Sequence, residues 1–143
     1  MVRFATSVTF AAILALIACS GDRGPQATDP QALLQAIPPA NSAQYEKVSD
    51  MKTWKNPYLI VRSDGVALLD TEDSAEIILK PEQLLPALAK LPASDWPYGR
   101  VVAAAENRTK ASERDGVAIR RNKGIVGGVL QGAHIAVRWV PSA

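Results

Sequence analysis

Apolar runs separated by turn residues divide the second half of the chain into short strands and helices. Two aliphatic runs, residues 58–62 and 66–69, lie on either side of Asp64 and Gly65, a pair that can take the positive φ angles of a tight turn. This pattern predicts an antiparallel hairpin. Residues 76–79 can add a third short strand.

A helical pattern follows this third strand. Lys80, Pro81 and Glu82 open it, and Pro92 ends it. Pro86 falls inside the pattern, so we expect this proline to kink the helix or delay its start. The leucines recur at a spacing that places them on one helical face, which consists of Leu84, Leu85, Leu88 and Leu91.

Two strand patterns flank a glycine-rich segment in the C-terminal part of the chain. Residues 100–105 are mostly small and apolar, and residues 134–140 alternate so that Trp139 is expected to point towards the core. Between them, each glycine inside residues 116–132 would cost a helix about 1 kcal/mol. We still predict a helix, in which the glycines allow close approach to the sheet. Its expected apolar face is Ala118, Ile125, Val126, Val129, Leu130 and Ala133.

The order of these elements predicts an α+β fold. We expect a two-layer sandwich, with a mixed sheet of four to five strands and two main helices on one face. Ahead of the sheet, Asp29 and Pro30 can start a short helix, and Pro38 and Pro39 would end it. The apolar stripe of this short helix is expected to be Ala32, Leu33, Ala36 and Ile37.

The N-terminus has the order of regions found in a secretory signal peptide. Arg3 supplies a positive charge, residues 4–17 are almost entirely apolar, and Ala18 is small. A transmembrane helix needs about 20 apolar residues. The apolar run is shorter than this, so it predicts export rather than a lasting membrane span.

The end of this leader resembles the lipobox of bacterial lipoproteins, carried by Leu16, Ile17, Ala18 and Cys19. In that family the cysteine thiol receives a diacylglyceryl group, the signal is cut before the cysteine, and the new amine is acylated. The resemblance implies that Cys19 is the lipidation site. Ser20 in the next position implies sorting to the outer membrane, facing the periplasm.

These features divide the chain into four parts. Residues 1–18 are expected to be the lipoprotein signal peptide, and residues 19–28 the lipidated cysteine with a flexible Gly/Pro/polar tether. Residues 29–56 would hold the short helix and an extended lead-in, and residues 57–143 a small α+β periplasmic domain. The alternative for Cys19 is a free or buried cysteine after an ordinary signal peptide, which would leave an unpaired thiol in an exported protein.

The exported part resembles the periplasmic domain of the ExbD/TolR family. The resemblance runs from about residue 57 to 140 and is carried by VRSDGVALLD, LKPEQLLPALAKL and RVVAAAEN. The resemblance implies the predicted α+β fold, a tendency to form a homodimer and proximity to peptidoglycan. The family's functional aspartate lies in a transmembrane helix that has no counterpart here, so the motor role is not carried over.

Charge gives no indication of a polyanionic partner. The chain has 16 basic and 14 acidic residues, and removal of the signal peptide takes away only Arg3 from this balance. Basic runs with interleaved aromatic residues, which nucleic-acid binding would require, are missing from the sequence. We therefore expect no nucleic-acid partner.

Few residues are candidates for catalysis or metal binding. His134 is the only histidine, and the spacing assigns it no serine or cysteine partner. The favoured interpretation is that His134 is a boundary residue of the last strand. Carboxylates that could bind calcium lack the EF-hand spacing, which favours a solvated acidic turn. These carboxylates are Asp70, Glu72, Asp73 and Glu76.

Three further motifs have both a structural and a functional interpretation. GIVGG, residues 124–128, invites a phosphate-loop hypothesis but lacks the GK[ST] that would follow, so helix packing is favoured. The triplet Asn107, Arg108 and Thr109 fits a glycosylation acceptor, which a bacterial lipoprotein does not need. Trp54 and Trp96 can pack over the ends of the sheet or form an exposed aromatic surface.

The sequence thus favours a lipid-anchored cell-envelope protein with a small non-catalytic interaction domain. We expect no enzyme activity, no cofactor and no metal. The expected partners are the membrane through the lipid anchor, and an envelope protein, a second copy of the chain or peptidoglycan. The alternative is an inhibitor or immunity lipoprotein that acts on a cell-wall hydrolase, with the acidic turn at residues 70–76 as the inserted loop.

Overall fold

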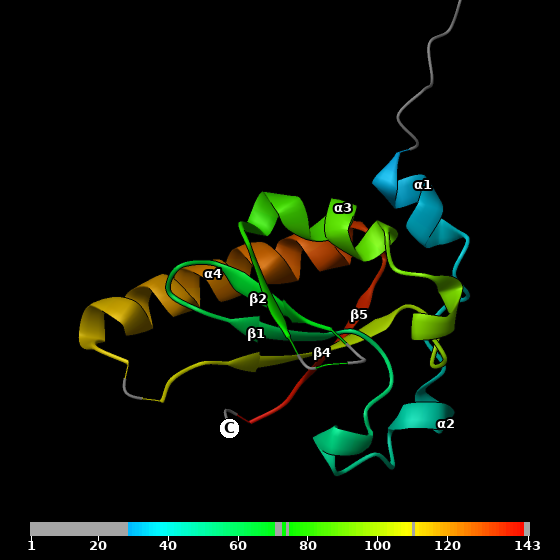
Figure 1. Ribbon diagram of the computed structural model, residues 1–143, viewed down its shortest axis with the longest axis horizontal. Helices are drawn as coiled ribbons and strands as arrows, with labels where there is room; N and C mark the ends of the chain where they lie inside the picture. The colour runs from blue at the N-terminus through cyan, green and yellow to red at the C-terminus, as the bar shows by residue number, and fades with distance from the viewer. Residues whose placement is uncertain (1–28, 71–72, 74, 110, 142–143) are drawn as a thin grey trace, which may run out of the picture.

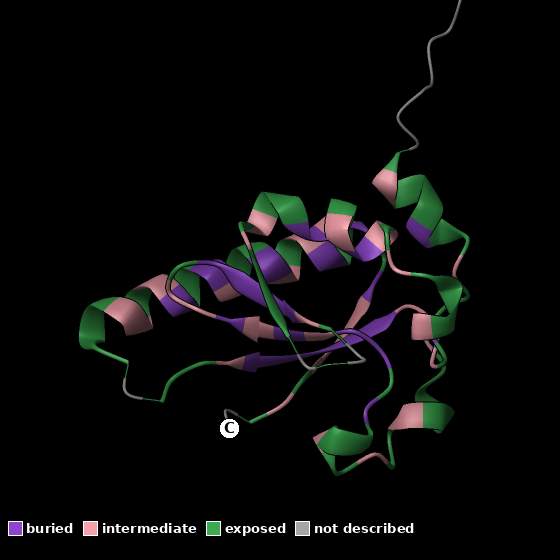
Figure 2. Cartoon of the chain, in the orientation of Figure 1, coloured by how far each residue is buried: buried purple, intermediate pink, exposed green. Residues whose placement is uncertain are grey.

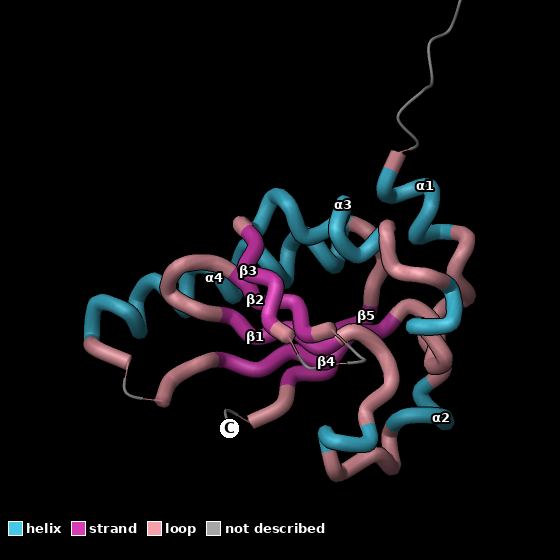
Figure 3. Tube along the Cα trace, viewed as in Figure 1, coloured by secondary structure: helices cyan, strands magenta, loops and turns pink. Residues whose placement is uncertain are grey.

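The computed structural model describes residues 29–70, 73, 75–109 and 111–141 (Figure 1). Five strands form one mixed sheet in the order β3-β2-β1-β4-β5. The neighbours β3/β2 and β2/β1 are antiparallel, whereas β1/β4 and β4/β5 are parallel. Figure 3 shows the five strands gathered at the centre of the domain, with helical segments around them. The strands are β1 (Tyr58–Val61), β2 (Val66–Leu69), β3 (Glu76–Leu79), β4 (Val101–Glu106) and β5 (Ala136–Trp139). The predicted α+β class with a mixed sheet is confirmed.

The main helices cover one face of this sheet. They are α1 (Pro30–Gln35), α3 (Leu84–Ala89) and the long α4 (Glu113–Gly132). The main core lies between these helices and the sheet, where Figure 2 shows the buried positions of both layers. Its fully buried large side chains include Leu34, Leu59, Leu84, Leu88 and Leu130.

Short helical turns lie against the opposite face of the sheet (Figure 1). Here the sequence predicted only an extended lead-in, but the structure has α2 (Ser42–Tyr45) and the 3-10 turn η1 (Met51–Thr53). The buried centre of this second, smaller cluster is Trp54 with Val101 and Ala103 of β4. The sheet therefore carries a full helix layer on one side and a partial cover on the other.

The predicted hairpin is present, and Gly65 takes a positive φ as expected, whereas Asp64 does not. The Arg62 amide donates to the Gly65 carbonyl at 2.9 Å, so Ser63 and Asp64 occupy the tip of the turn. Gly65 has a φ of 154°, and a Cβ on it would lie 2.3 Å from the carbonyl oxygen of Leu79. The glycine thus permits the close approach of β3 to the start of β2.

Pro86 delays the start of α3, which is one of the two outcomes predicted for it, the other being a kink. The chain first forms a 3-10 turn, η2 (Pro81–Gln83), and becomes α-helical at Leu84. Pro86 then lies in the first turn, where backbone N–H groups have no partner within the helix. The third 3-10 turn, η3 (Ala93–Asp95), leads through Trp96 into β4.

The predicted apolar face of α1 is wrong. Leu34 is fully buried, whereas Leu33 is 44% exposed, and only Ile37 of the expected stripe packs against the core. The helix is anchored from its polar side as well. The Gln35 amide donates to the carbonyl of Ala133 at 3.1 Å.

The glycine-rich segment is one continuous helix, α4, as predicted, and the predicted apolar face is right in part, because Val126, Leu130 and Ala133 are buried as expected. The residues turned towards the sheet are Ile119, Asn122, Val126 and Leu130. Ile125, which was expected inside, is 45% exposed. The exposed side of this helix also carries apolar residues, Val117 and Ile125, so the spacing alone did not show that Ile125 lies outside the buried face.

The glycines of α4 do not mediate close packing against the sheet, contrary to the prediction. A Cβ added at Gly124, Gly127, Gly128 or Gly132 would have no heavy atom within 4 Å outside the local helix backbone. The phosphate-loop hypothesis for residues 124–128 is wrong as well. These residues lie in the interior of a helix, where backbone amides are used in helical hydrogen bonds.

Candidate functional site

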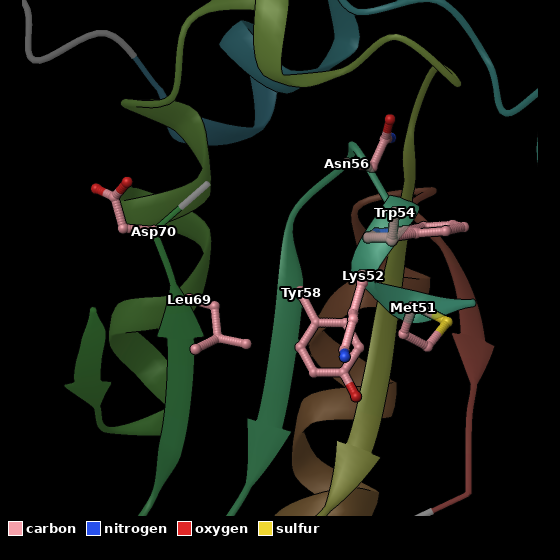
Figure 4. A pocket seen from close by; sticks show the side chains of 7 residues that line it. All are labelled: Met51, Lys52, Trp54, Asn56, Tyr58, Leu69 and Asp70. Carbon is pink, nitrogen blue, oxygen red and sulfur yellow. The ribbon is translucent and has the colours of Figure 1, made fainter. Parts of the chain in front are cut away.

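A pocket of about 300 Å³ opens on the sheet face opposite α4 (Figure 4). Its walls come from η1, from the segment that leads into β1, and from the end of β2. The lining side chains are Met51, Lys52, Trp54, Asn56, Tyr58, Leu69 and Asp70. This volume is at the lower limit of ligand sites and suits one inserted side chain or a similarly small group.

One wall residue of this pocket, Trp54, belongs to an aromatic cluster with Tyr45 and Tyr98. The ring centroids of Trp54 and Tyr98 are 5.1 Å apart, and Tyr45 meets Trp54 edge to face at 5.9 Å. The Trp54 indole N–H donates to the carbonyl of Pro57 at 3.2 Å. The indole N–H of this wall residue is therefore already used. Of the two interpretations of Trp54, packing against the sheet is confirmed, on a face of β4 rather than at an end of the sheet.

Arg138 of β5 attaches this wall to the sheet. Its guanidinium donates to the carbonyl of Val48 at 2.7 Å and also to the carbonyl of Tyr45. The same group lies 5.8 Å from the centroid of the Trp54 ring. Because these contacts join residues about ninety positions apart, nothing in the local sequence pattern indicated them.

Asn56 has a structural role in the pocket. Its side chain is 1% exposed, and its Nδ2 donates to the carbonyls of Gly99 and Val101, both at 2.8 Å. Its Oδ1 accepts from the amide of Tyr98 at 2.9 Å. Since both ends of the amide are used, Asn56 fixes the loop before β4 and has little capacity left for a ligand.

Two polar groups of the pocket can act on a bound group. Lys52 contributes an ammonium at the rim, and Tyr58 contributes a hydroxyl. Burial raises the pKa of the Tyr58 hydroxyl above its usual value of 10.0, so this group stays protonated and can donate a hydrogen bond. The arrangement favours a small ligand or side chain with an apolar body and an acceptor at one end.

The free edge of β3 is the second candidate feature. Ile77 is 50% exposed and Ile78 is 46% exposed, although both lie in a strand. The Asp70 amide donates to the Ala75 carbonyl, so residue 75 forms a hydrogen-bonded pair with the chain at the end of β2. Because such pairs alternate along an antiparallel ladder, the backbone groups of residues 75, 77 and 79 point towards β2. The N–H and C=O groups of Glu76 and Ile78 therefore point away from the sheet.

Charged residues lie beside this edge. Arg62 at the tip of the hairpin forms an ion pair with Glu76 at 2.8 Å and another with Asp64 at 3.2 Å. Lys80 follows β3 directly and continues its extended backbone, with φ −73° and ψ 152°. The Lys80 amide is capped by the Gln83 side chain at 2.9 Å, which ends the strand at this residue.

The predicted acidic turn is only partly described. Asp70 lies at the pocket, and Glu76 pairs with Arg62. Asp73 is exposed and its carboxylate accepts from the amide of Ala75 at 2.9 Å, whereas Glu72 lies outside the described residues. Within the part that the structure describes, no three histidine, cysteine or acidic residues gather as a metal site.

His134 occupies the turn between α4 and β5. It has a φ of 56°, and its side chain is exposed at one end of a groove between α4 and the edge strand β5. The groove is lined by Gly127, Gln131, Ile135, Ala136, Val137 and Trp139 besides the histidine. His134 is thus a boundary residue of the last strand, as favoured, and this lining brings no carboxylate or hydroxyl side chain to it.

The prediction that Trp139 points into the core is wrong. Its side chain is 39% exposed, and the ammonium of Lys123 lies 4.5 Å from its ring centroid. Trp139 shares the α4 side of the sheet with Val137 but lies beyond the region that α4 covers with apolar residues. Trp96, by contrast, is 3% exposed and belongs to the main core.

The expected lipidation site, Cys19, lies outside the described residues, as do the signal peptide and tether. Among the residues that are described, no helix is long and apolar enough to cross a membrane. The triplet at Asn107 follows β4 in an exposed loop, with the Asn107 amide donating to the carbonyl of Val61 at 2.9 Å.

Comparison with known proteins gives no relative for this chain. No family model, no curated protein and no solved structure matches it.

Proposed function

We propose that this protein is a lipid-anchored component of the bacterial cell envelope, held by Cys19 at the outer membrane, whose small α+β domain is a non-catalytic interaction module in the periplasm. The observation that carries the interaction role is the β3 edge. This edge exposes two isoleucines beside backbone groups of Glu76 and Ile78 that pair with no neighbouring strand among the described residues. An exposed apolar edge favours pairing with another chain and is normally blocked in proteins that do not use it.

The pocket supports the same role. It lies on the same side of the sheet as the side chains of Glu76 and Ile78, because Glu76 pairs with Leu69 and alternate residues share a face. Its aromatic wall and the Lys52 ammonium provide an anchor point for one partner side chain. Edge and pocket together form a surface suited to an extended segment of an envelope protein.

The leader supports the anchored location. A cysteine that follows Leu16, Ile17 and Ala18 at the end of an apolar run has the residue types that lipoprotein processing requires. Three acyl chains would give membrane binding far stronger than the marginal binding of a single chain. The resemblance to the ExbD/TolR periplasmic domain supports placement near peptidoglycan.

Fractionation of bacteria that express the full chain tests the anchor. The chain should incorporate labelled fatty acid and sediment with the outer membrane. Cys19→Ala should lose the label and move to the soluble fraction, whereas Ser20→Asp should keep the label and move to the inner membrane. Retention of Cys19→Ala in the membrane would contradict the proposal.

Photo-crosslinking from Ile78, with Val117 on the exposed side of α4 as the control position, tests the interaction role. Val117 is 55% exposed, so the two positions are matched in accessibility. Crosslinks to an envelope protein or to the chain itself from position 78 alone would support the proposal. Capture of a cell-wall hydrolase whose activity falls on binding would instead favour the inhibitor alternative.

A further inference from the structure

We infer that β3 pairs with β3 of a second copy of the chain, antiparallel and around a two-fold axis at Ile78, so that two five-stranded sheets join into one. This inference rests on the proposed function and names the partner of its interaction surface. The segment is chemically complementary to itself. The strand and the residue after it read Glu76, Ile77, Ile78, Leu79 and Lys80.

The charges of this segment match when it is paired with itself. Around a two-fold axis at Ile78, Glu76 of each copy lies opposite Lys80 of the other, on the same face of the sheet. Each dimer therefore gains two cross-strand pairs of opposite charge, in which the Glu76 carboxylate is shared between Lys80 of the other copy and Arg62 of its own chain at 2.8 Å. Ile78 meets its own copy between these pairs. On the helix side, Ile77 lies opposite Leu79 of the other copy, which covers the 50% exposed side chain of Ile77.

The backbone is available for this pairing. The N–H and C=O groups of Ile78 point away from β2, so in the proposed register the two copies of Ile78 can exchange two hydrogen bonds. The Glu76 amide faces the Lys80 carbonyl of the other copy, which already accepts from the Gln83 amide of its own chain at 2.9 Å and can accept a second bond. The Lys80 amide needs no new partner because Gln83 caps it at 2.9 Å.

The geometry also agrees with two lipid anchors in one membrane. A two-fold axis normal to a continuous sheet keeps the helix layers of both copies on the same side. Each tether would enter the domain at Asp29, which caps α1. This helix belongs to the helix layer, because its Leu34 packs in the core between the helices and the sheet. Both tethers thus enter from one side, and the high local concentration in a membrane favours a pairing whose interface is small.

Disulfide crosslinking of the full chain in membranes tests the pairing. In Ile78→Cys the two new thiols lie on a hydrogen-bonded antiparallel pair, with Cα atoms about 5.5 Å apart, a distance that a disulfide can span. We expect a crosslinked dimer after mild oxidation, less of it from Ile77→Cys, and none from the wild type or Val117→Cys. The inference would be overturned if Ile78→Cys formed no more dimer than the wild type and Val117→Cys, or if Ile77→Cys formed more dimer than Ile78→Cys.

Charge exchange separates the specific pairing from chance collisions. In the Ile78→Cys background, Glu76→Lys alone and Lys80→Glu alone each place like charges opposite each other twice, which should reduce the dimer by about tenfold. When the two variants are expressed together, the mixed dimer regains both opposite-charge pairs and should crosslink again. Because the rescue uses the same two chains, misfolding does not explain a loss that mixing restores. Failure of mixing to restore the dimer, or insensitivity to the charges, would overturn the inference.

The same fractions distinguish this inference from the proposed function. A chain that sediments with the membrane but forms no dimer through position 78 overturns the pairing and leaves the lipid-anchored role intact. A chain that is soluble but crosslinks at position 78 overturns the anchor and supports the pairing.

Discussion

The side-chain amide of Asn122, on the buried face of α4, donates a hydrogen bond of 2.8 Å to the backbone carbonyl of Arg62. A second bond of 3.3 Å reaches the carbonyl of Ser63. Asn122 is 5% exposed, so a polar side chain is directed from the helix layer into the tip of the β1–β2 hairpin. This contact fixes where α4 lies along the sheet.

Asn122→Ala should therefore lower the free energy of unfolding by more than the lost side-chain packing alone would. Two carbonyls at the hairpin tip would lose their donor, and an unsatisfied buried group costs about 1–3 kcal/mol. Chemical denaturation of the purified chain measures this change in the free energy of unfolding. Gln131→Ala, an exposed polar position on the same helix, is the control and should change stability by less than about 0.5 kcal/mol. Equal effects of the two substitutions would contradict the role of Asn122.

The exposed glycines of α4 predict stabilising substitutions. Gly124 and Gly128 lie in the helix interior with open space where a Cβ would stand, so alanine restricts the unfolded chain without a clash. Gly124→Ala and Gly128→Ala should each raise the free energy of unfolding by about 0.4–1 kcal/mol. Gly65→Ala should lower it, because its Cβ would meet the Leu79 carbonyl at 2.3 Å. A loss of stability in either α4 variant would show that this face is covered in the folded protein.

The strands could be predicted from the sequence because their signals are local. The aliphatic runs around Gly65 and the alternation at the C-terminus each lie within a few residues, and all of them formed strands. The orientation of α4 was predicted only in part: Val126 and Leu130 are buried as expected, but the polar Asn122 also lies on the buried face and the apolar Ile125 lies on the exposed one. The pocket depends on contacts such as Arg138 with Val48, which no local spacing encodes.

Removal of Arg138 should release the pocket wall while leaving the sheet folded. Arg138→Ala loses the charged hydrogen bonds to the carbonyls of Tyr45 and Val48 and the contact with the Trp54 ring. Bonds of this kind contribute about 1.5–3 kcal/mol, so hydrogen exchange of residues 45–54 should rise about tenfold or more. Exchange in β2 should stay unchanged, and exposed Arg114→Ala should leave both regions as they are. A uniform rise across the chain would contradict a local role for Arg138.

Glu106 makes the stability of the domain depend on pH in the acid range. The hydrogen bond from Lys123, at 2.5 Å, is the main cause that holds the pKa of the Glu106 carboxyl below its usual value of 4.5, and Arg108 adds a second bond. The folded pKa thus lies below the unfolded one. The resulting stabilisation is fully present above the unfolded pKa and is lost as the pH falls through the folded pKa.

We therefore expect Glu106→Gln to be less stable than the wild type at pH 7, and the difference to shrink as the pH falls below about 4.5. Thermal unfolding at a series of pH values measures both curves. Glu46→Gln, at an exposed carboxyl outside any ion pair among the described residues, is the control and should follow the wild type throughout. The same ion pair holds Lys123 beside Trp139, so Glu106→Gln should also alter the fluorescence of that indole at pH 7. A difference in stability that stays constant with pH would show that Glu106 acts through packing rather than through its charge.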